Sequence, residues 1–184
     1  MELLDFFYGR LSRSIGSTTL IEIEKRTYRG NMNPIAAILD GARLSHTLPI
    51  LKIVETGTHD TKKIAIWCSQ NSASSFVTVD LDSATQESYH RELEELSAAS
   101  AYSFRTQDHK KFLSELSWID VAFLYPENLQ EGLAEYQLAI SAGARLVVMY
   151  DFQSRSNIAV KQAKRLGWDV HFTGEYAIMI RDNN

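Results

Sequence analysis

The sequence contains very little cysteine, and this limits the chemistry available to it. With one cysteine, Cys68, among 184 residues, no internal disulfide can form. One thiol and five scattered histidines show no CxxC or HExxH spacing, which excludes zinc sites of those types. A chain without disulfides is typical of a reducing compartment, so we expect a cytoplasmic protein.

Long hydrophobic runs are also lacking. No stretch approaches the roughly 18 to 20 consecutive apolar residues that a membrane helix needs. Residues 1–5 lack the basic start and apolar middle of a signal peptide. We therefore expect no membrane partner.

Positive charge is not in excess. Nineteen Lys and Arg residues stand against twenty-three Asp and Glu residues, which gives a net charge of −4. A mildly acidic surface has no long-range attraction for phosphate backbones, and the basic residues are spread over separate predicted helices. We therefore expect no nucleic-acid partner.

The residues that are present describe a globular α/β protein. An apolar content of 45% with 23% charged residues is typical of a folded domain, and the length fits one compact domain overall. Residues 1–50 are interpreted as an N-terminal helical cap and residues 51–184 as the main domain. A predicted helix over residues 3–11 packs on that domain or on a partner, so a homo-oligomer through the cap is one expectation.

Short apolar runs rich in β-branched and aromatic residues alternate with segments of helical period in the main domain. Because connections of this kind produce parallel strands, we expect a three-layer α/β sandwich. Its sheet has seven strands and is mostly parallel, with the last strand antiparallel because only two residues separate it from the sixth. The predicted strands cover residues 51–56, 75–80, 102–106, 120–125, 146–150, 168–173 and 176–181.

Helix boundaries and buried faces can also be read from the pattern. Pro34 is predicted to open one helix, and Gly143 and Gly167 to follow the ends of two others. The helix before Gly143 is expected to bury one stripe of apolar side chains, made of Leu129, Leu133, Tyr136 and Ile140.

Polar residues follow the first two predicted strands at the edge where an open parallel sheet binds ligands. Glu55, Gly57 and Thr58 form a turn into a helix, where glycine permits close approach of the backbone to a ligand. Asp80 and Leu81 end the second strand, at the spacing from which an acid reaches a ribose hydroxyl in nucleotide-binding units. The sequence therefore indicates a nucleoside ligand with an unphosphorylated ribose.

The third strand runs into Asp108, whose carboxylate stands at a helix N-cap position. With this residue, the segments IVETGT, FVTVDLD, TQDHKKFL and IDVAFLYPE resemble motifs of the class I S-adenosylmethionine-dependent methyltransferases. The small-molecule O-methyltransferase-like branch is the most similar. The resemblance covers about residues 48–181 and implies a Rossmann-like fold with S-adenosylmethionine as cofactor and a small-molecule acceptor.

The same resemblance assigns a site to individual residues. It places Glu55, Gly57 and Thr58 beside the methionine, Asp80 and Leu81 beside the ribose and its neighbourhood, and Asp108 beside the adenine amine. The metal-dependent branch carries acids after the fourth and fifth strands, where this chain has Tyr125 and Tyr150 followed by Asp151. Too few oxygen ligands remain for Mg²⁺, so we expect no catalytic metal.

Catalytic candidates then come from the rim of the sheet. Glu127 or Asp151 could take a proton from a hydroxyl acceptor, and His59 could carry a proton within the cofactor turn. Tyr125, Asn128 and Tyr150 are the candidates for the substrate rim. The other histidines, at positions 46, 90, 109 and 171, are interpreted as surface residues without a role.

Other functions stay open at this point. His59 stands where the family has a second glycine, which favours a non-catalytic protein of the same fold that serves as a binding or assembly subunit. An enzyme that uses or cleaves S-adenosylmethionine by a different route is a third possibility. A nicotinamide oxidoreductase is disfavoured because no GxGxxG is present.

Overall fold

The computed structural model describes residues 34–45, 50–71, 74–95, 101–150, 157–173 and 175–181. The chain divides into two compact units, residues 1–49 and residues 50–184. In the first unit, helix α3 (Pro34–Ser45) begins at the predicted proline and buries Ile35, Ile38 and Leu39. The predicted helix over residues 3–11, with its suggested oligomer contact, lies outside the described residues.

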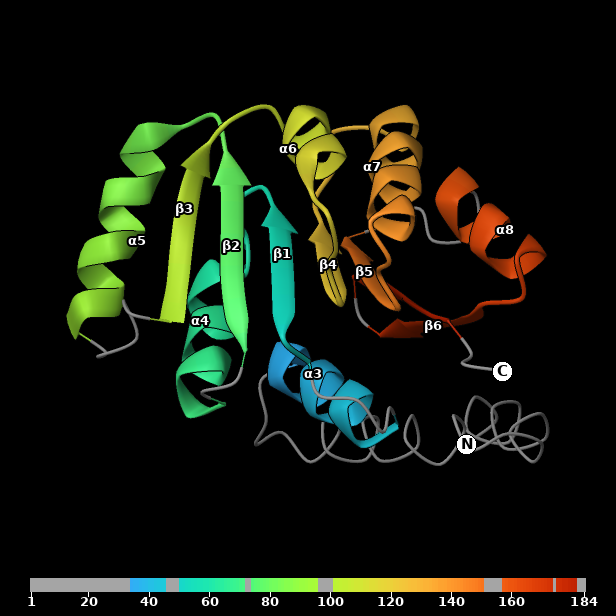
Figure 1. Ribbon diagram of the computed structural model, residues 1–184, viewed down its shortest axis with the longest axis horizontal. Helices are drawn as coiled ribbons and strands as arrows, with labels where there is room; N and C mark the ends of the chain where they lie inside the picture. The colour runs from blue at the N-terminus through green and yellow to red at the C-terminus, as the bar shows by residue number, and fades with distance from the viewer. Residues whose placement is uncertain are drawn as a thin grey trace. The chain divides into compact units, whose positions relative to one another are not determined.

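The second unit is built on a seven-stranded sheet with strand order β3-β2-β1-β4-β5-β7-β6 (Figure 1). Strands β1 to β5 are parallel, and β7 runs antiparallel to both β5 and β6. The predicted fold class is thus confirmed. The strands are β1 (Lys52–Thr56), β2 (Ser75–Asp80), β3 (Tyr102–Thr106), β4 (Val121–Leu124), β5 (Leu146–Tyr150), β6 (Asp169–Thr173) and β7 (Tyr176–Ile180).

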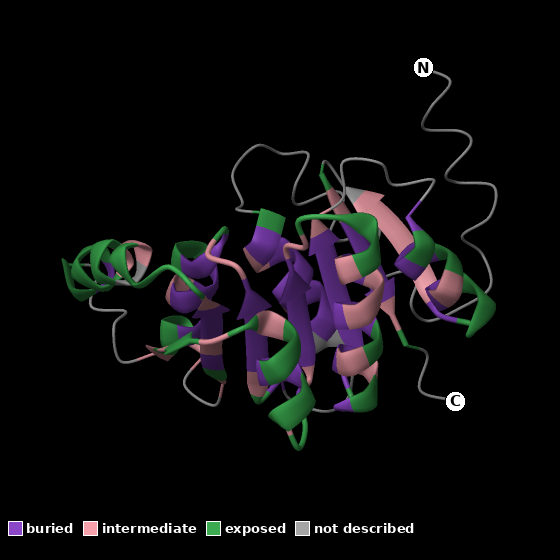
Figure 2. Ribbon diagram, turned by 90° about the horizontal axis from the view of Figure 1, so that it is seen from above, coloured by how far each residue is buried: buried purple, intermediate pink, exposed green. Residues whose placement is uncertain are grey.

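Helices cover both faces of this sheet. They are α4 (Thr61–Gln70), α5 (Ser83–Glu95), α6 (His109–Glu115), α7 (Leu129–Ser141) and α8 (Ile158–Arg165). Helix α4 contacts α5 on one face, and α6, α7 and α8 pack side by side on the other (Figure 1). The buried strands lie between these layers (Figure 2), which explains why β4 and β5 are almost continuously apolar.

The side on which successive strands are added changes at β1, and this change positions the candidate site. From β1 the chain moves to β2 and then β3 on one side, and later to β4 and β5 on the other. The strand order therefore has its switch point between β1 and β4. Polar side chains at the carboxyl ends of β1, β2 and β4 converge there.

The ends of α7 and α8 lie where they were predicted, whereas the buried face of α7 differs from the prediction. Gly143 and Gly167 have φ values of 91° and 80° just beyond α7 and α8, where the left-handed region favours glycine. Leu129, predicted to be buried, is 37% exposed because it begins α7 and so lies in the first turn at the rim. The buried stripe of α7 instead contains Gly132, Glu135, Tyr136 and Ala139.

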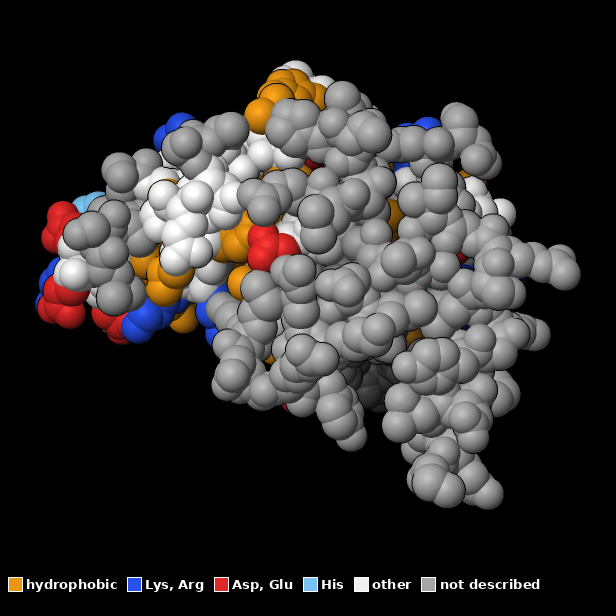
Figure 3. Space-filling model, turned by 90° about the horizontal axis from the view of Figure 1, so that it is seen from below, with side chains coloured by type: hydrophobic (Ala, Val, Ile, Leu, Met, Phe, Trp, Pro, Cys, Tyr) orange, Lys and Arg blue, Asp and Glu red, His pale blue; other side chains and the backbone are white. Residues whose placement is uncertain are grey.

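The prediction that His171 lies on the surface is wrong, because its Nε2 is buried and burial lowers the pKa of the ring. The helix α5 and Cys68 match their predicted environments. The outer face of α5 carries exposed charges of both signs, visible in Figure 3 at the end of the molecule where α5 lies. Cys68 is buried, and this burial raises the pKa of its thiol to about 12, so it behaves as a core residue. In the described part of the chain, no helix combines the length and apolarity that crossing a bilayer requires.

Candidate functional site

The turn after β1 is shaped by a glycine in the left-handed region. Gly57 has φ 79°, and its N–H donates to the carbonyl of Val79 at 2.8 Å, which ties the turn to the end of β2. A Cβ at this position would lie 3.3 Å from the Cβ of Tyr125, tighter than ordinary contact. The backbone at the switch point is therefore close-packed, and a side chain at residue 57 would be strained.

Glu55 supports this turn from beneath rather than facing outward. Its side chain is fully buried, and one oxygen accepts from the N–H groups of His59 at 3.3 Å and Asp60 at 2.7 Å. The other oxygen accepts from the hydroxyls of Thr61 at 2.5 Å and Thr78 at 2.9 Å. Burial, only partly offset by these hydrogen bonds, raises the pKa of Glu55 to about 7. Glu55 thus positions residues 59–61.

Asp80 lies beside the same turn with part of its hydrogen-bonding capacity unused. Thr58 donates to one oxygen from its N–H at 3.1 Å and from its hydroxyl at 2.8 Å. The other oxygen accepts one bond, from the N–H of Asp82 at 3.1 Å. Next to it, the apolar side chain of Leu81 is 67% exposed. A carboxylate has about four acceptor sites, so Asp80 can accept a further ligand hydroxyl.

Asp108 lies at the end of the neighbouring strand, where it caps α6. Its carboxylate accepts from the N–H of Lys111 at 2.9 Å, as the N-cap interpretation predicts. The N–H of Gln107 donates to the Asp80 carbonyl at 3.3 Å, which holds the ends of β2 and β3 together. We call the set Gly57, Thr58, Asp80, Leu81 and Asp108 the open edge.

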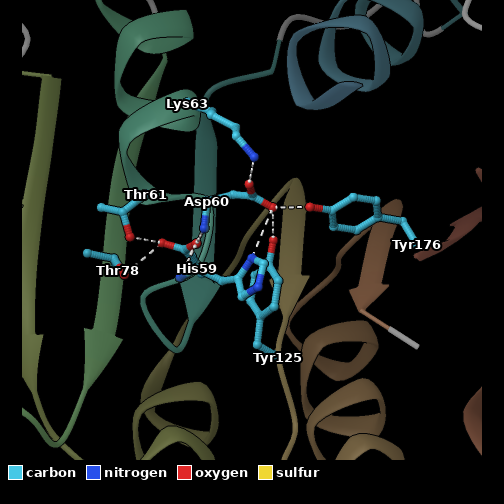
Figure 4. A network of polar contacts seen from close by, with 8 residues as sticks. His59, Asp60, Thr61, Lys63, Thr78, Tyr125 and Tyr176 are labelled. Carbon is cyan, nitrogen blue, oxygen red and sulfur yellow. Dashed lines mark hydrogen bonds and ion pairs between the residues drawn. The ribbon is translucent and has the colours of Figure 1, made fainter. Parts of the chain in front are cut away.

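The other side of the switch point is organised around Asp60, whose side chain is fully buried. Figure 4 shows Lys63 reaching one carboxylate oxygen, at 2.5 Å, while the hydroxyls of Tyr125 and Tyr176 both donate to the other, Tyr176 at 2.5 Å. Burial acts to raise the pKa of Asp60, but these three donors hold it below its ordinary value.

Aromatic rings fill the space around Asp60. His59 stacks on Tyr125 with ring centroids 4.7 Å apart, and its centroid is 4.8 Å from that of Tyr150. Tyr150 in turn meets Tyr176 edge-on at 5.8 Å. We call Asp60, Lys63 and the four rings of His59, Tyr125, Tyr150 and Tyr176 the closed edge.

This arrangement changes what the predicted rim residues can do. Burial and the charge of Asp60 raise the pKa of Tyr125, and its hydroxyl is committed to Asp60, so Tyr125 has a structural role in the closed edge. Asn128 caps α7 by accepting from the N–H groups of Gln130 and Glu131 at 3.1 and 3.0 Å. His59 stays about half exposed, with its Nδ1 3.7 Å from Asp60. Glu127 is exposed, and Asp151 lies outside the described residues.

Sequence reasoning missed a contact between His109 and the buried Glu135 near the turn. Glu135 on α7 is 2% exposed, accepts from the hydroxyl of Thr56 at 2.8 Å, and lies 3.1 Å from Nδ1 of His109. The interpretation of His109 as a surface residue is therefore wrong, because its side chain is only 24% exposed. The burial of Glu135 could have been suspected from the sequence, because its helical spacing places it on one stripe of α7 with the small residues Gly132 and Ala139.

No group of three or more His, Cys, Asp or Glu side chains that could hold a metal ion occurs among the described residues. At this edge the expected cofactor would meet the Asp80 and Asp108 carboxylates and the exposed Leu81 side chain.

Comparison with known proteins identifies the architecture. No protein-family model and no curated protein matches the sequence. The fold is similar to a methyltransferase from Geobacter sulfurreducens, with 14% identity, 98% of this chain and 97% of that chain covered, and a TM-score of 0.63. It is also similar to an S-adenosylmethionine-dependent O-methyltransferase from Thermotoga maritima, with 12% identity, coverage of 82% and 64%, and a TM-score of 0.58.

A third similar structure is TrmN from Thermus thermophilus, with 19% identity, 86% of this chain covered and a TM-score of 0.54. The chain spans 51% of the length of that protein and 38% of the bifunctional kinase-methyltransferase WbdD. At these identities the likeness concerns the fold. The second unit has the Rossmann-like fold of class I methyltransferases, as the resemblance of its motifs predicts.

Proposed function

We propose that this protein binds S-adenosylmethionine at the open edge and transfers its methyl group to a small-molecule acceptor without a metal ion. The observation that carries the proposal is the Asp80 carboxylate. It is fixed against the Gly57 turn by both donors of Thr58 and still has acceptor capacity, next to an exposed Leu81. A carboxylate held in this way at a strand end is arranged for hydroxyl groups of a ligand.

Each residue of the open edge then has a distinct task. Asp80 accepts from the ribose hydroxyls, and Leu81 offers an apolar surface to the base. Asp108, which caps α6 with one oxygen, has its other oxygen for the adenine amine. Gly57 lets the ligand approach the backbone, and Glu55 keeps the turn in place from beneath.

Catalysis in this proposal depends on aligning the acceptor with the methyl group and on removing one proton from the acceptor hydroxyl. S-adenosylmethionine supplies a methyl group activated by its sulfonium charge. His59 is the protein group best placed to accept a proton from a hydroxyl acceptor, because its ring is half exposed beside the turn and its Nδ1 faces Asp60. Glu127, an exposed carboxylate after β4, and Asp151 are the alternative proton acceptors.

The proposal needs no metal. Tyr125 and Tyr150 stand at the ends of β4 and β5, where hard oxygen ligands for Mg²⁺ would be required, and the Tyr125 hydroxyl already donates to Asp60. Methyl transfer is a direct displacement, which can proceed from positioning and proton removal.

Calorimetric titration with S-adenosylmethionine and S-adenosylhomocysteine tests the proposal. We expect micromolar binding of both, and Asp80→Ala should weaken it by about 1.5 to 3 kcal/mol, or roughly 10- to 150-fold. Asp82→Ala is the matched control, because Asp82 is exposed and caps the start of α5. Equal affinity of the Asp80→Ala variant and the wild type would remove Asp80 from the site, and an absence of binding would refute the proposal.

A second function is favoured by the closed edge. His59 and the tyrosines pack against one another at the switch point, which is where ligands of open α/β sheets usually bind. If they leave no room for a cofactor, the protein is a non-catalytic binding or assembly subunit of the same fold. An unshifted melting temperature with both ligands would support this alternative.

A further inference from the structure

The pair formed by the partly exposed His109 and the buried Glu135 has no task in the function proposed above. Glu135 is 2% exposed, and Thr56, the last residue of β1, holds one of its oxygens through a hydroxyl at 2.8 Å. The second oxygen lies 3.1 Å from Nδ1 of His109, the first residue of α6. A buried carboxylate with a single ionisable partner is costly for folding, so its presence calls for an explanation.

The imidazole of His109 reaches the proposed cofactor turn. Its Cε1 lies 4.0 Å from the point that a Cβ on Gly57 would occupy, and the side chain remains 24% exposed. Glu135 fixes the orientation of the ring by binding Nδ1, which leaves Nε2 on the opposite edge. The ring thus borders the turn while its counter-charge lies buried behind it.

The charges of three carboxylates on different elements act on this histidine. Glu135 on α7 contacts it directly, and Asp80 at the end of β2 and Asp108 at the cap of α6 act through their charge. Burial acts to lower the pKa of His109, but the hydrogen bond and charge of Glu135, together with the two aspartates, raise it above its ordinary value. The pair is neutral overall when His109 is protonated, and it carries one negative charge after the proton leaves.

We propose that the His109–Glu135 pair sets the charge beside the cofactor turn and thereby the preference of the protein for cationic S-adenosylmethionine over neutral S-adenosylhomocysteine. This inference rests on the proposed function. A negative pair attracts the sulfonium and is indifferent to the thioether, whereas a neutral pair favours neither. Preference for the cofactor over its product therefore increases as pH rises, and acidification removes this preference.

The ratio of two dissociation constants measures this preference directly. We define selectivity as the Kd of S-adenosylhomocysteine divided by the Kd of S-adenosylmethionine, measured by calorimetry at pH 6, 7, 8 and 9. Selectivity of the wild type should rise about fivefold across this range. Taking the ratio reduces the effect of protonation events that change both affinities alike, such as the general loss of stability at extreme pH.

Three variants separate the pair from other causes. His109→Gln should give a ratio that rises less with pH than that of the wild type, because Glu55 beneath the turn still titrates near pH 7. Glu135→Gln should lower the ratio at pH 9 because the negative charge is gone. His90→Gln is the matched control: His90 also pairs with a glutamate, Glu94 at 3.2 Å, but on the exposed face of α5. That variant should follow the wild type.

The possible failures are distinguishable. A His109→Gln protein whose ratio still rises as in the wild type overturns this inference and leaves the proposed function standing. If neither ligand binds at any pH, the proposed function is refuted and this inference with it. Should Glu135→Gln fail to fold, His109→Gln, whose side chain is partly exposed, still decides the question.

Discussion

The two edges that flank the switch point use the same residue types in opposite ways. On the open edge, Asp80 is held by Thr58, retains acceptor capacity and lies beside the exposed Leu81. On the closed edge, Asp60 is fully buried, and its oxygens are taken by Lys63, Tyr125 and Tyr176. A carboxylate near the switch point is therefore a candidate for ligand binding only when the chain itself leaves it incompletely bonded.

The contrast also separates two parts of the turn. Residues 57 and 58 face the open edge, whereas residues 59 and 60 belong to the closed edge, and Glu55 anchors the second pair through their N–H groups. One short turn thus links a ligand-accessible region to a region stabilised by internal contacts. The following changes test whether these regions differ in the way proposed.

The largest effect is expected from Asp60→Ala. This change leaves the Lys63 ammonium and the hydroxyls of Tyr125 and Tyr176 without their shared partner, and we expect a loss of roughly 3 kcal/mol in the free energy of unfolding. Urea denaturation measures it. Lys62→Ala is the control, because Lys62 pairs with Glu92 on the surface, where about 0 to 1 kcal/mol is expected. Equal stability of both variants would contradict a structural closed edge.

The next largest effect is the dependence of folding stability on pH through Glu55. Its pKa in the folded state is raised from 4.5 to about 7, so between these values the native protein holds a proton that the unfolded chain has released. Stability from this group is complete below pH 4.5 and is lost as pH rises through 7, by at most about 1.4 kcal/mol per pH unit.

Glu55→Gln removes that titration, so its stability should change less between pH 5 and pH 7 than that of the wild type. Denaturant unfolding at pH 5, 6, 7 and 8 measures the difference. Parallel curves for the two proteins would show that Glu55 does not hold its proton in the folded state.

Two helix N-caps, Asn128 and Asp108, can be compared to separate a purely structural role from a role in cofactor binding. Asn128→Ala should cost about 1 kcal/mol of stability by removing the cap of α7, without changing cofactor affinity. Asp108→Ala removes a comparable cap from α6 and should lower both stability and affinity. Thermal unfolding and calorimetry report the two quantities. Reduced affinity in Asn128→Ala would return that residue to the binding rim.

The smallest effect is expected within the open edge. Thr58→Val removes the hydroxyl bond to Asp80 at 2.8 Å but keeps the N–H bond at 3.1 Å, so Asp80 is held less firmly. The Kd of S-adenosylhomocysteine should increase by a factor of about 2 to 10, consistent with a net hydrogen-bond contribution of about 0.5 to 1.5 kcal/mol. An unchanged Kd would mean that the orientation of Asp80 does not depend on the Thr58 side chain.

Sequence patterns predicted the sheet because its strands are specified locally. The apolar runs ending at Thr56, Asp80 and Tyr150 form strands with those same final residues, since buried parallel strands need continuous apolar stretches. The prediction for Leu129 failed because periodicity does not show where a helix meets the rim of the sheet.

The closed edge could not be predicted in the same way, because it depends on residues brought together by the fold. Asp60 meets Tyr125 from 65 positions and Tyr176 from 116 positions along the chain. Glu135 and His109 meet because α6 packs against α7. The open edge, in contrast, follows from strand ends that topology places at one edge, which is why Gly57, Asp80 and Asp108 could be named from the sequence.

The most direct test of the difference between the edges is an NMR titration of the protein with S-adenosylhomocysteine, in which backbone amide shifts are followed residue by residue. The account predicts the largest changes at Gly57, Thr58 and Leu81, with the amides of Lys63 and Tyr176 little affected. Saturable binding that shifts the amides of the closed edge and leaves those of the open edge unchanged would contradict it.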